Sequence, residues 1–280
     1  MRALSITKPG IIFGNIVTLC GGFFLGSAVT VNWLLLLVTI IGMALVIACG
    51  CILNNVIDRD IDRLMERTKN RVLAQGLMSN QAAVLYALVL GLCGLLVLYF
   101  GVNLLTTILA VIGLFFYVGV YTLCLKRYSV YGTLIGGIAG AIPPVAGYTA
   151  ATNRLDNGAW IAFLILFLWQ MPHFYAIAIY RLKDFSAASV PVLPIKRGIA
   201  YTKISMVCYI ILFIIATMMP TLFGYTGWDY LVIAVLLGLA WLIFAVKGFY
   251  VKDDRLWARK VFLFSILVIT VVSVMMLVKV

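Results

Sequence analysis

Nine long apolar segments take up most of this 280-residue chain, and they limit what it can fold into. An α-helix rises about 1.5 Å per residue, so about 20 apolar residues cross the hydrocarbon core of a bilayer. The predicted spans are residues 10–31, 33–57, 82–102, 104–125, 131–151, 159–180, 204–223, 229–249 and 260–280. Because backbone polar groups in lipid must bond within their own segment, these spans predict an all-α membrane protein, with residues 1–280 forming one transmembrane domain.

Composition supports lipid as the solvent. Only 11% of the residues are charged and 65% are apolar, whereas a soluble domain is about 25% charged. The net charge of +12 could indicate a nucleic-acid partner, but its distribution gives another explanation. The N-terminal segment and the even-numbered loops contain 19 of the 21 Lys and Arg residues, Arg154 and Lys279 being the exceptions. This positive-inside pattern predicts a cytoplasmic N-terminus, a periplasmic C-terminus and no nucleic-acid partner.

Charged residues gather in two long inner loops, residues 58–80 and 181–203, while the outer loops are nearly free of charge. A channel or carrier more often places ionisable groups in mid-membrane. The pattern here instead favours a bundle of about nine helices around a central cavity that opens to the cytoplasmic side.

Asn54, Asp58 and Asp62 follow one another at intervals of four residues at the end of the second span. If the helix continues, they form one narrow stripe. Stacked carboxylates repel by roughly a few tenths of a kcal/mol per pair in water, and a bound cation relieves that repulsion. Hard oxygen ligands with room left for phosphate suit Mg²⁺.

The alternative is a solvated amphipathic loop in which the acids pair with neighbouring basic residues, namely Arg59, Arg63 and Arg67. The stripe begins at Asn54, inside the apolar span, where a purely solvated face would not begin. This start favours the metal site.

His173, the only histidine, lies within the sixth span directly after Pro172. An ionisable residue inside a span is a functional candidate. The structural alternative is a histidine that bonds to a carbonyl freed by the proline.

Several motifs resemble those of a known family. The pattern N-N-x-x-D-x-x-x-D at residues 54–62, followed by R-T-K-N-R at residues 67–71, resembles the first aspartate-rich motif of the UbiA-type intramembrane aromatic prenyltransferases. W-Q-M-P-H-F at residues 169–174, the segment 184–194 and the Gly-rich run 131–144 are similar to the haem-farnesylating branch of that family.

Two positions depart from the family pattern. Asn55 stands where aspartate is common, and the second aspartate-rich motif retains only Asp184 because residue 188 is alanine. A full second metal site is therefore in question. Basic residues near Asp184 would then hold diphosphate oxygens directly, namely Arg181, Lys183, Lys196 and Arg197.

The resemblance implies an Mg²⁺-dependent transfer of a farnesyl group from farnesyl diphosphate to a vinyl group of haem b, with water addition, giving haem O and diphosphate. The implied metal ligands are Asn54, Asp58, Asp62 and Asp184. The implied substrate contacts are Asn55, Arg67, Arg71, Lys126, Arg127 and His173, with Asp184 and the four basic residues near it. Tyr180, one turn before Asp184, is a candidate for the water-addition step.

Other functions remain open. A quinone-ring precursor is an alternative acceptor, and a haem or lipid carrier or an oxidase assembly factor is a non-enzymatic alternative. The implied location is a bacterial inner membrane, and the implied partners besides the two substrates and the bilayer are a downstream haem-handling enzyme or a terminal oxidase.

Overall fold

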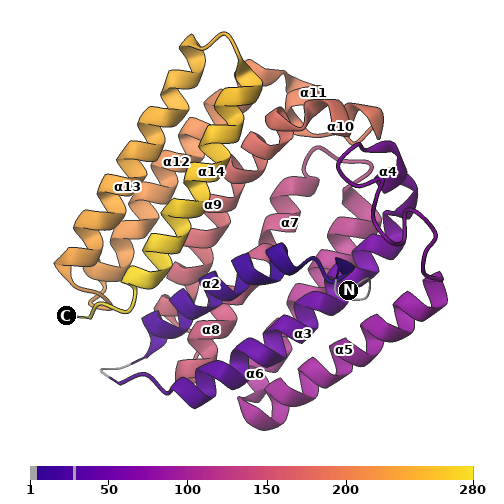
Figure 1. Ribbon diagram of the computed structural model, residues 1–280. Coiled ribbons are helices and arrows are strands. Elements are labelled where there is room, and N and C mark those ends of the chain that lie inside the picture. The colour runs from indigo at the N-terminus through magenta and orange to yellow at the C-terminus, as the bar shows by residue number, and fades with distance from the viewer. Residues whose placement is uncertain (1–4, 28–29, 280) are drawn as a thin grey trace.

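The computed structural model describes residues 5–27 and 30–279, and in this part of the chain nine helices are long and apolar enough to cross a membrane. Figure 1 shows them as one bundle, in which no strand occurs among the described residues. The spans are α2 (Pro9–Gly26), α3 (Trp33–Ile57), α5 (Asn80–Gly101), α6 with η1 (Leu104–Leu114, Phe115–Leu125), α7 with α8 (Gly132–Gly140, Ile142–Thr152), α9 (Asn157–Tyr180), α12 (Ile199–Leu222), α13 with η2 (Trp228–Lys247, Gly248–Tyr250) and α14 (Asp254–Met275). The prediction of an all-α, multi-pass membrane protein is confirmed.

Two predicted spans, 33–57 and 104–125, match the structure residue for residue. Each starts after an asparagine whose side-chain oxygen accepts a bond from the first turn: Asn32 from Leu35 N at 3.0 Å, and Asn103 from Thr106 N at 2.8 Å. Such a cap satisfies a backbone donor that the helix leaves unpaired. The predicted ends at Val31 and Val280 are less exact, and residues 28, 29 and 280 lie outside the described part.

The last span was predicted to start too late. α14 begins at Asp254, six residues before Lys260, because Asp253 caps it by accepting a bond from Leu256 N at 3.0 Å. Arg255 and Arg259 therefore belong to this helix instead of to the preceding loop.

Two spans change their winding inside the membrane. The fifth breaks at Ala141 into α7 and α8, directly before Pro143 and Pro144, which lack the N–H that a continuous helix needs. The fourth changes from α6 into the π-helix η1, where each turn takes an extra residue. The winding lasts to the end of η1, since Lys126 N bonds to Tyr121 O at 2.8 Å.

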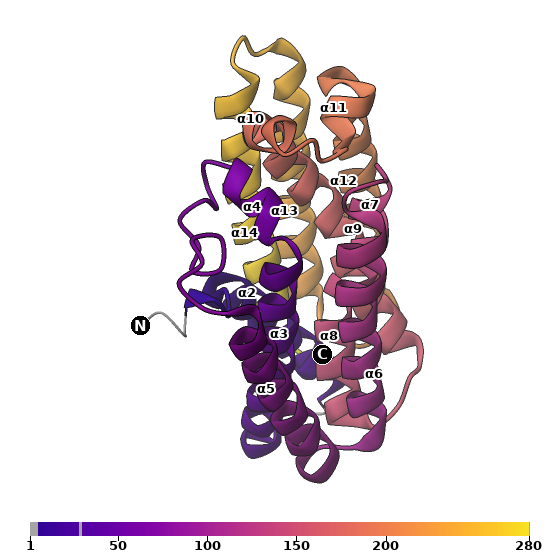
Figure 2. The same ribbon diagram turned by 90° about the vertical axis from the view of Figure 1, so that its right-hand side faces the viewer.

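α9 lies at the centre of the bundle: 67% of its apolar window is buried inside the protein, against 17% for the fourth span. It packs against α12 and α14, while α3 packs against α5 (Figure 2). α2 and α8 approach so closely that a Cβ at Gly22 would lie 1.8 Å from Pro144 O, and one at Gly147 would lie 2.0 Å from Leu19 O. Small residues permit such contact between helix backbones in membranes.

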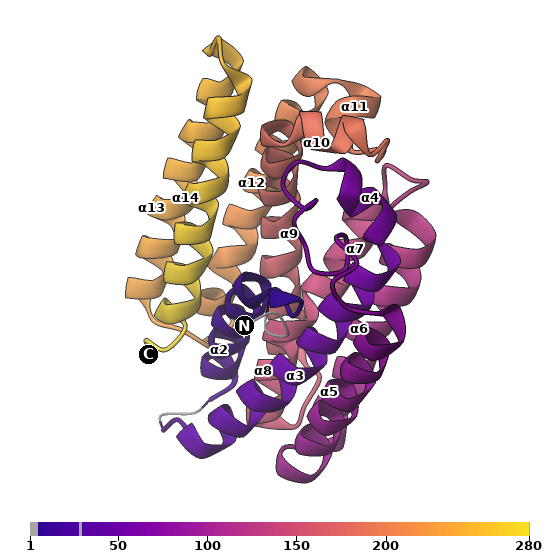
Figure 3. The same cartoon turned by 45° about the vertical axis from the view of Figure 1, so that its right-hand side comes forward.

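The short helices α4 (Arg59–Leu64), α10 (Leu182–Ala187) and α11 (Leu193–Arg197) lie at one end of the bundle, here called the basic end (Figures 1 and 3). The two long loops meet there, because Glu66 N donates to Asp184 Oδ1 at 3.1 Å. An apolar cluster strengthens this contact between the two loops, which together are here called the cap at the basic end. The buried members of the cluster are Ile61, Met65, Ala188 and Val190. Residues far apart in the sequence thus close one end of the bundle together.

Candidate active site at the basic end

Asp58 lies at the junction of α3 and α4 and is fully buried, with 0% of its surface exposed. Its Oδ2 accepts hydrogen bonds from Asn54 Nδ2, at 2.8 Å, and from the Lys126 ammonium group. Its Oδ1 is buried and has no hydrogen-bond partner among the described residues. The guanidinium nearest to Oδ1 is that of Arg127, at 3.9 Å.

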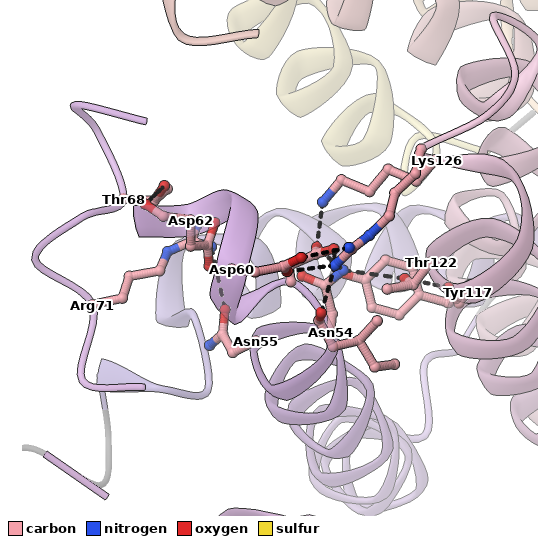
Figure 4. A network of polar contacts seen from close by, with 12 residues as sticks. Asn54, Asn55, Asp60, Asp62, Thr68, Arg71, Tyr117, Thr122 and Lys126 are labelled. Carbon is pink, nitrogen blue, oxygen red and sulfur yellow. Dashed lines mark hydrogen bonds and ion pairs between the residues drawn. The ribbon is translucent and has the colours of Figure 1, made fainter. Parts of the chain in front are cut away.

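Asp62 lies one turn further on, in α4, and is also buried. Arg71 Nη1 donates to Asp62 Oδ2 at 2.7 Å and to Asn55 Oδ1 at 3.3 Å (Figure 4). The predicted stripe assumed one continuous helix, but α3 ends at Ile57. Asp58 and Asp62 therefore pair with different cations, and this separate pairing offsets the cost of burying two carboxylates.

The π-helix η1 brings polar groups to Asp58 from the other side. Thr122 Oγ1 accepts a bond from Asn54 Nδ2 at 3.1 Å and donates to Tyr117 O at 2.7 Å (Figure 4). Lys126 follows directly after η1. Wide helical turns often occur at functional sites, and here they set the direction of Thr122 and Lys126.

Arg127 forms a two-pronged ion pair with Asp60, with Nη1 and Nη2 each 2.7 Å from a carboxylate oxygen. The hydrogen bond from Arg127 lowers the pKa of Asp60, and the same bond raises the pKa of Arg127. Asp60 is 65% exposed at its side chain, as expected for a residue outside the stripe. Arg127 also donates to Ile57 O at 2.6 Å and so ties the loop after η1 to the end of α3.

Lys8 also belongs to this cluster, although it was not among the predicted site residues. Its ammonium group donates to Asn54 Oδ1, and its backbone is left-handed, with φ 56°. Burial, and secondly the charge of Arg71, lower the pKa of Lys8 to about 7. The sequence signal was a basic residue directly before Pro9, where the first span begins. A left-handed non-glycine residue is strained, and such strain clusters at functional sites.

The cluster carries an excess of positive charge, which favours anion binding. Its five basic residues are Lys8, Arg67, Arg71, Lys126 and Arg127, against three acidic ones, Asp58, Asp60 and Asp62. The formal excess is 5 − 3, or two, and Lys8 is only partly charged near neutral pH because its pKa is about 7. Burial and the charges of Arg71 and Arg181 lower the pKa of Arg67. Beside the cluster is a cavity of about 240 Å³, lined by Ser5, Ile6, Asn55, Arg67, Asn70, Arg71, Val72 and Leu73. A large central cavity stays a prediction.

The donor set fits an Mg²⁺ ion that takes only one or two protein carboxylates. Among the described residues, no group of three or more His, Cys, Asp and Glu side chains gathers as a metal cage. Asn54 Oδ1, Asp62 Oδ2 and Asp184 Oδ1 accept bonds from Lys8, Arg71 and Glu66 N respectively. Asp58 Oδ1 has free lone pairs, and Mg²⁺ often completes its shell with water and substrate phosphate.

His173 is buried in α9 between Trp169, at a ring-centroid distance of 4.4 Å, and Phe262 of α14, at 5.0 Å. Its Nδ1 lies 2.7 Å from Ser265 Oγ, so its partner is a side chain and not a carbonyl freed by Pro172. Ser265 Oγ donates its single proton to Phe262 O at 2.6 Å and must therefore accept from Nδ1–H. This tautomer leaves the Nε2 lone pair as an acceptor or metal ligand.

The remaining predicted residues lie elsewhere at the basic end. The Tyr180 ring has the guanidinium of Arg181 over it at 4.4 Å, and the unpredicted Arg255 and Arg259 approach it at 5.7 and 5.9 Å. Three exposed basic residues, Lys183, Lys196 and Arg197, have no hydrogen bond or ion pair to the Asp58 cluster among the described residues. They stay predictions.

Comparison with known proteins agrees with this geometry. The model of the UbiA prenyltransferase family matches residues 15–267. The chain belongs to the UbiA prenyltransferase family. Relatives described as protoheme IX farnesyltransferases include one from Yersinia enterocolitica, 55% identical over 98% of this chain and 92% of that protein, and one from Cronobacter sakazakii, 54% identical over the same shares.

Solved structures of other proteins share the fold. A structure of digeranylgeranylglyceryl phosphate synthase aligns with a TM-score of 0.78 at 22% identity, covering 99% of this chain and 98% of that one. A UbiA homologue from Archaeoglobus fulgidus, bound to GPP and Mg²⁺, aligns with a TM-score of 0.73 at 15% identity, covering 99% of each chain. The family match and the protoheme IX farnesyltransferase relatives, together with the nine apolar helices of the described residues, make the protein a membrane-embedded prenyltransferase.

Proposed function

We propose that this prenyltransferase moves a farnesyl group from farnesyl diphosphate to a vinyl group of haem b, with water addition, giving haem O and diphosphate. The observation that carries the proposal is the 55% identity, over 98% of the chain, to a protein described as a protoheme IX farnesyltransferase. The buried acid–base cluster supplies a diphosphate site, and His173 supplies a nitrogen suited to an iron porphyrin.

On the donor side, the proposed contacts to the diphosphate are Asn55, Arg67, Arg71, Lys126 and Arg127, and Lys8 joins them. Asp58 would hold Mg²⁺ through its free Oδ1, and the other predicted ligands, Asn54, Asp62 and Asp184, would take part only where their present protein partners turn to the diphosphate. The ion, when bound, neutralises the diphosphate and makes it a better leaving group. Lys8 and Lys126 lie against Asn54 and Asp58 and can turn their N–H groups to the departing oxygens. Donors fixed in advance favour the charge that develops as the bond breaks.

Breaking the bond between the farnesyl carbon and the diphosphate oxygen leaves an allylic cation. The vinyl group of haem attacks this cation through its terminal carbon, and water captures the new cation beside the porphyrin ring and then loses a proton. Tyr117 and Tyr121, stacked at 6.1 Å next to Thr122, are aromatic faces close to the site that can stabilise the allylic cation. Tyr180 was predicted to serve the water-addition step, but its ring faces three guanidinium groups, and we assign it no part in that step.

On the acceptor side, His173 either ligates the haem iron through Nε2 or orients the porphyrin. The hydrogen bond from Nδ1 to Ser265 holds the ring in one orientation, as outer partners of metal-binding histidines commonly do. The proposed location is a bacterial inner membrane, with the basic end facing the cytoplasm as the positive-inside pattern predicts. A haem-handling enzyme or terminal oxidase would accept the product.

The test is a mass-spectrometric assay of the purified protein in detergent with haem b, farnesyl diphosphate and Mg²⁺. We expect a haem product that carries a hydroxyethylfarnesyl group, together with free diphosphate. Prenylation of a benzoate or naphthoate instead of haem would reject the acceptor and keep the family activity. Haem binding with no diphosphate release would support a carrier.

Replacing His173 by Gln is expected to weaken haem binding by about tenfold or more and to remove the spectral signature of imidazole ligation, because Gln keeps a hydrogen bond to Ser265 without an imidazole nitrogen. Absorbance titration with haem b measures both effects. Phe174→Leu, which changes a ring 5.3 Å from His173, is the packing control and should keep that signature. An unchanged spectrum in the His173 variant would limit the histidine to a structural role.

A further inference from the structure

Three arginines from two helices converge on one aromatic ring at the basic end. Arg181 follows Tyr180 at the end of α9, while Arg255 and Arg259 stand four residues apart on one face of α14. Their guanidinium carbons lie 4.4, 5.7 and 5.9 Å from the centre of the Tyr180 ring. The positive-inside rule explains why basic residues lie at this end, but it does not explain why three of them share one ring.

These charges are poorly compensated. Within residues 5–27 and 30–279, no carboxylate lies within 4.0 Å of Arg255 or Arg259, and Arg181 reaches Asp184 only at 4.0 Å. The two acids next to Arg255 in the sequence are used elsewhere: Asp253 caps α14, and Asp254 pairs with Lys203. Arg255 and Arg259 are exposed, so solvent screens part of their repulsion, and both guanidinium groups are accessible to an anion.

On the same two helices, aromatic side chains lie deeper in the membrane than the Tyr180 ring. His173 precedes Tyr180 by seven residues, about two turns, so both lie on the same face of α9, about 10 Å apart along its axis. On α14, Phe262 follows Arg259 by three residues and contacts His173, with ring centroids 5.0 Å apart. α9 and α14 lie side by side over this length (Figure 1).

We infer that Arg255 and Arg259, with Arg181, bind the propionate carboxylates of the haem acceptor and thereby fix which edge of the porphyrin enters the membrane. This inference rests on the proposed function. A porphyrin has its metal at the centre and both carboxylates on one edge, and the distance from centre to carboxylate is of the same order as the distance from His173 to Tyr180. The guanidinium fork matches a carboxylate, and the Tyr180 ring holds the guanidinium groups in place. The vinyl groups of the porphyrin then lie deeper in the membrane than its carboxylates.

The test compares two ligands, haem b and its dimethyl ester, whose carboxylates are blocked, by absorbance titration of the full-length protein in nanodiscs of zwitterionic lipid. The parent protein should bind haem b about tenfold more tightly than the diester. In the double variant Arg255→Gln/Arg259→Gln, haem b should bind as weakly as the diester, while the affinity for the diester stays unchanged. Lys260→Gln removes one exposed charge from the same helix and is the control; it should behave like the parent.

Equal affinity of the parent for haem b and the diester would overturn the inference, as would an unchanged preference in the double variant. If the preference changed only in nanodiscs of anionic lipid, the arginines would bind lipid phosphate instead, and the inference would be wrong. Failure of the parent to bind either ligand would reject the proposed haem acceptor itself. Product analysis gives a second readout, since a porphyrin held by its carboxylates should be prenylated at one vinyl position, and the double variant should give both isomers.

Discussion

Asp58→Asn is expected to lower the rate of prenyl transfer at least about a thousandfold, the largest effect of any single substitution in the site. Asparagine has the same shape and keeps a carbonyl oxygen toward Asn54. It removes the charge that binds Lys126, and it replaces the free Oδ1 by an amide nitrogen, which has no lone pair for a metal ion. Single-turnover assays at saturating donor should show the loss in the chemical step, and the Mg²⁺ concentration for half-maximal activity should rise.

The matched control is Asp60→Asn, which removes a carboxylate two residues away. Asp60 is mostly exposed and, within the described part of the chain, its side chain pairs only with Arg127; exposed pairs contribute about 0–1 kcal/mol. We expect less than about a fivefold change in rate for this variant. Comparable losses in the two variants, or more than a tenth of the parent rate in Asp58→Asn, would contradict a special role for Asp58.

Gly22→Ala is expected to prevent stable folding, or to destabilise the bundle by at least about 3 kcal/mol. The new Cβ would lie 1.8 Å from Pro144 O and 2.6 Å from its carbonyl carbon. These are backbone atoms at the start of α8, so no side-chain rotation can make room. The yield of monodisperse protein and its thermal unfolding in detergent measure the effect.

Gly14→Ala serves as the control in the same helix. A Cβ at Gly14 meets no atom within 4 Å, and alanine is the better helix former. This variant should be as stable as the parent or slightly more stable. Equal melting temperatures for the Gly22 and Gly14 variants would mean that α2 and α8 separate more easily than their backbone contact implies.

The sequence predicted the spans well where local signals mark them. Asn32 and Asn103 precede the two spans that were exact, because a cap acts on its own first turn. The start of α14 was missed because its first two turns contain Asp254, Arg255 and Arg259, and hydropathy alone places such residues in a loop. The π-helical winding of η1 has no comparable local signal.

The site was predicted in part for a related reason. Asn54, Asp58 and Asp62 stand at regular spacing within one segment, so their proximity follows from local geometry. The proximity of their partners does not follow from local geometry. Lys8 is 46 residues from Asn54 and Lys126 is 68 residues from Asp58, so only tertiary packing brings each pair together. The break after Ile57 was also missed, because regular i, i+4 spacing does not show where a helix ends. Nor does this spacing show that Asp58 and Asp62 each pair with a separate cation.

The cap at the basic end has a consequence for local stability. Among the described residues, the two loops contact one another through one hydrogen bond, between Glu66 N and Asp184 Oδ1, and a small apolar cluster, whereas the helices beneath share a much larger core. Proteins open in cooperative units whose free energies follow the contacts that each unit makes. The contact between the loops is therefore a low-energy opening point, which can part while the bundle stays folded and while Arg71 still holds the first loop to Asn55 at the end of α3. Amide protons in the cap then exchange with solvent far sooner than those of α9, and a spent diphosphate can leave by the same local opening.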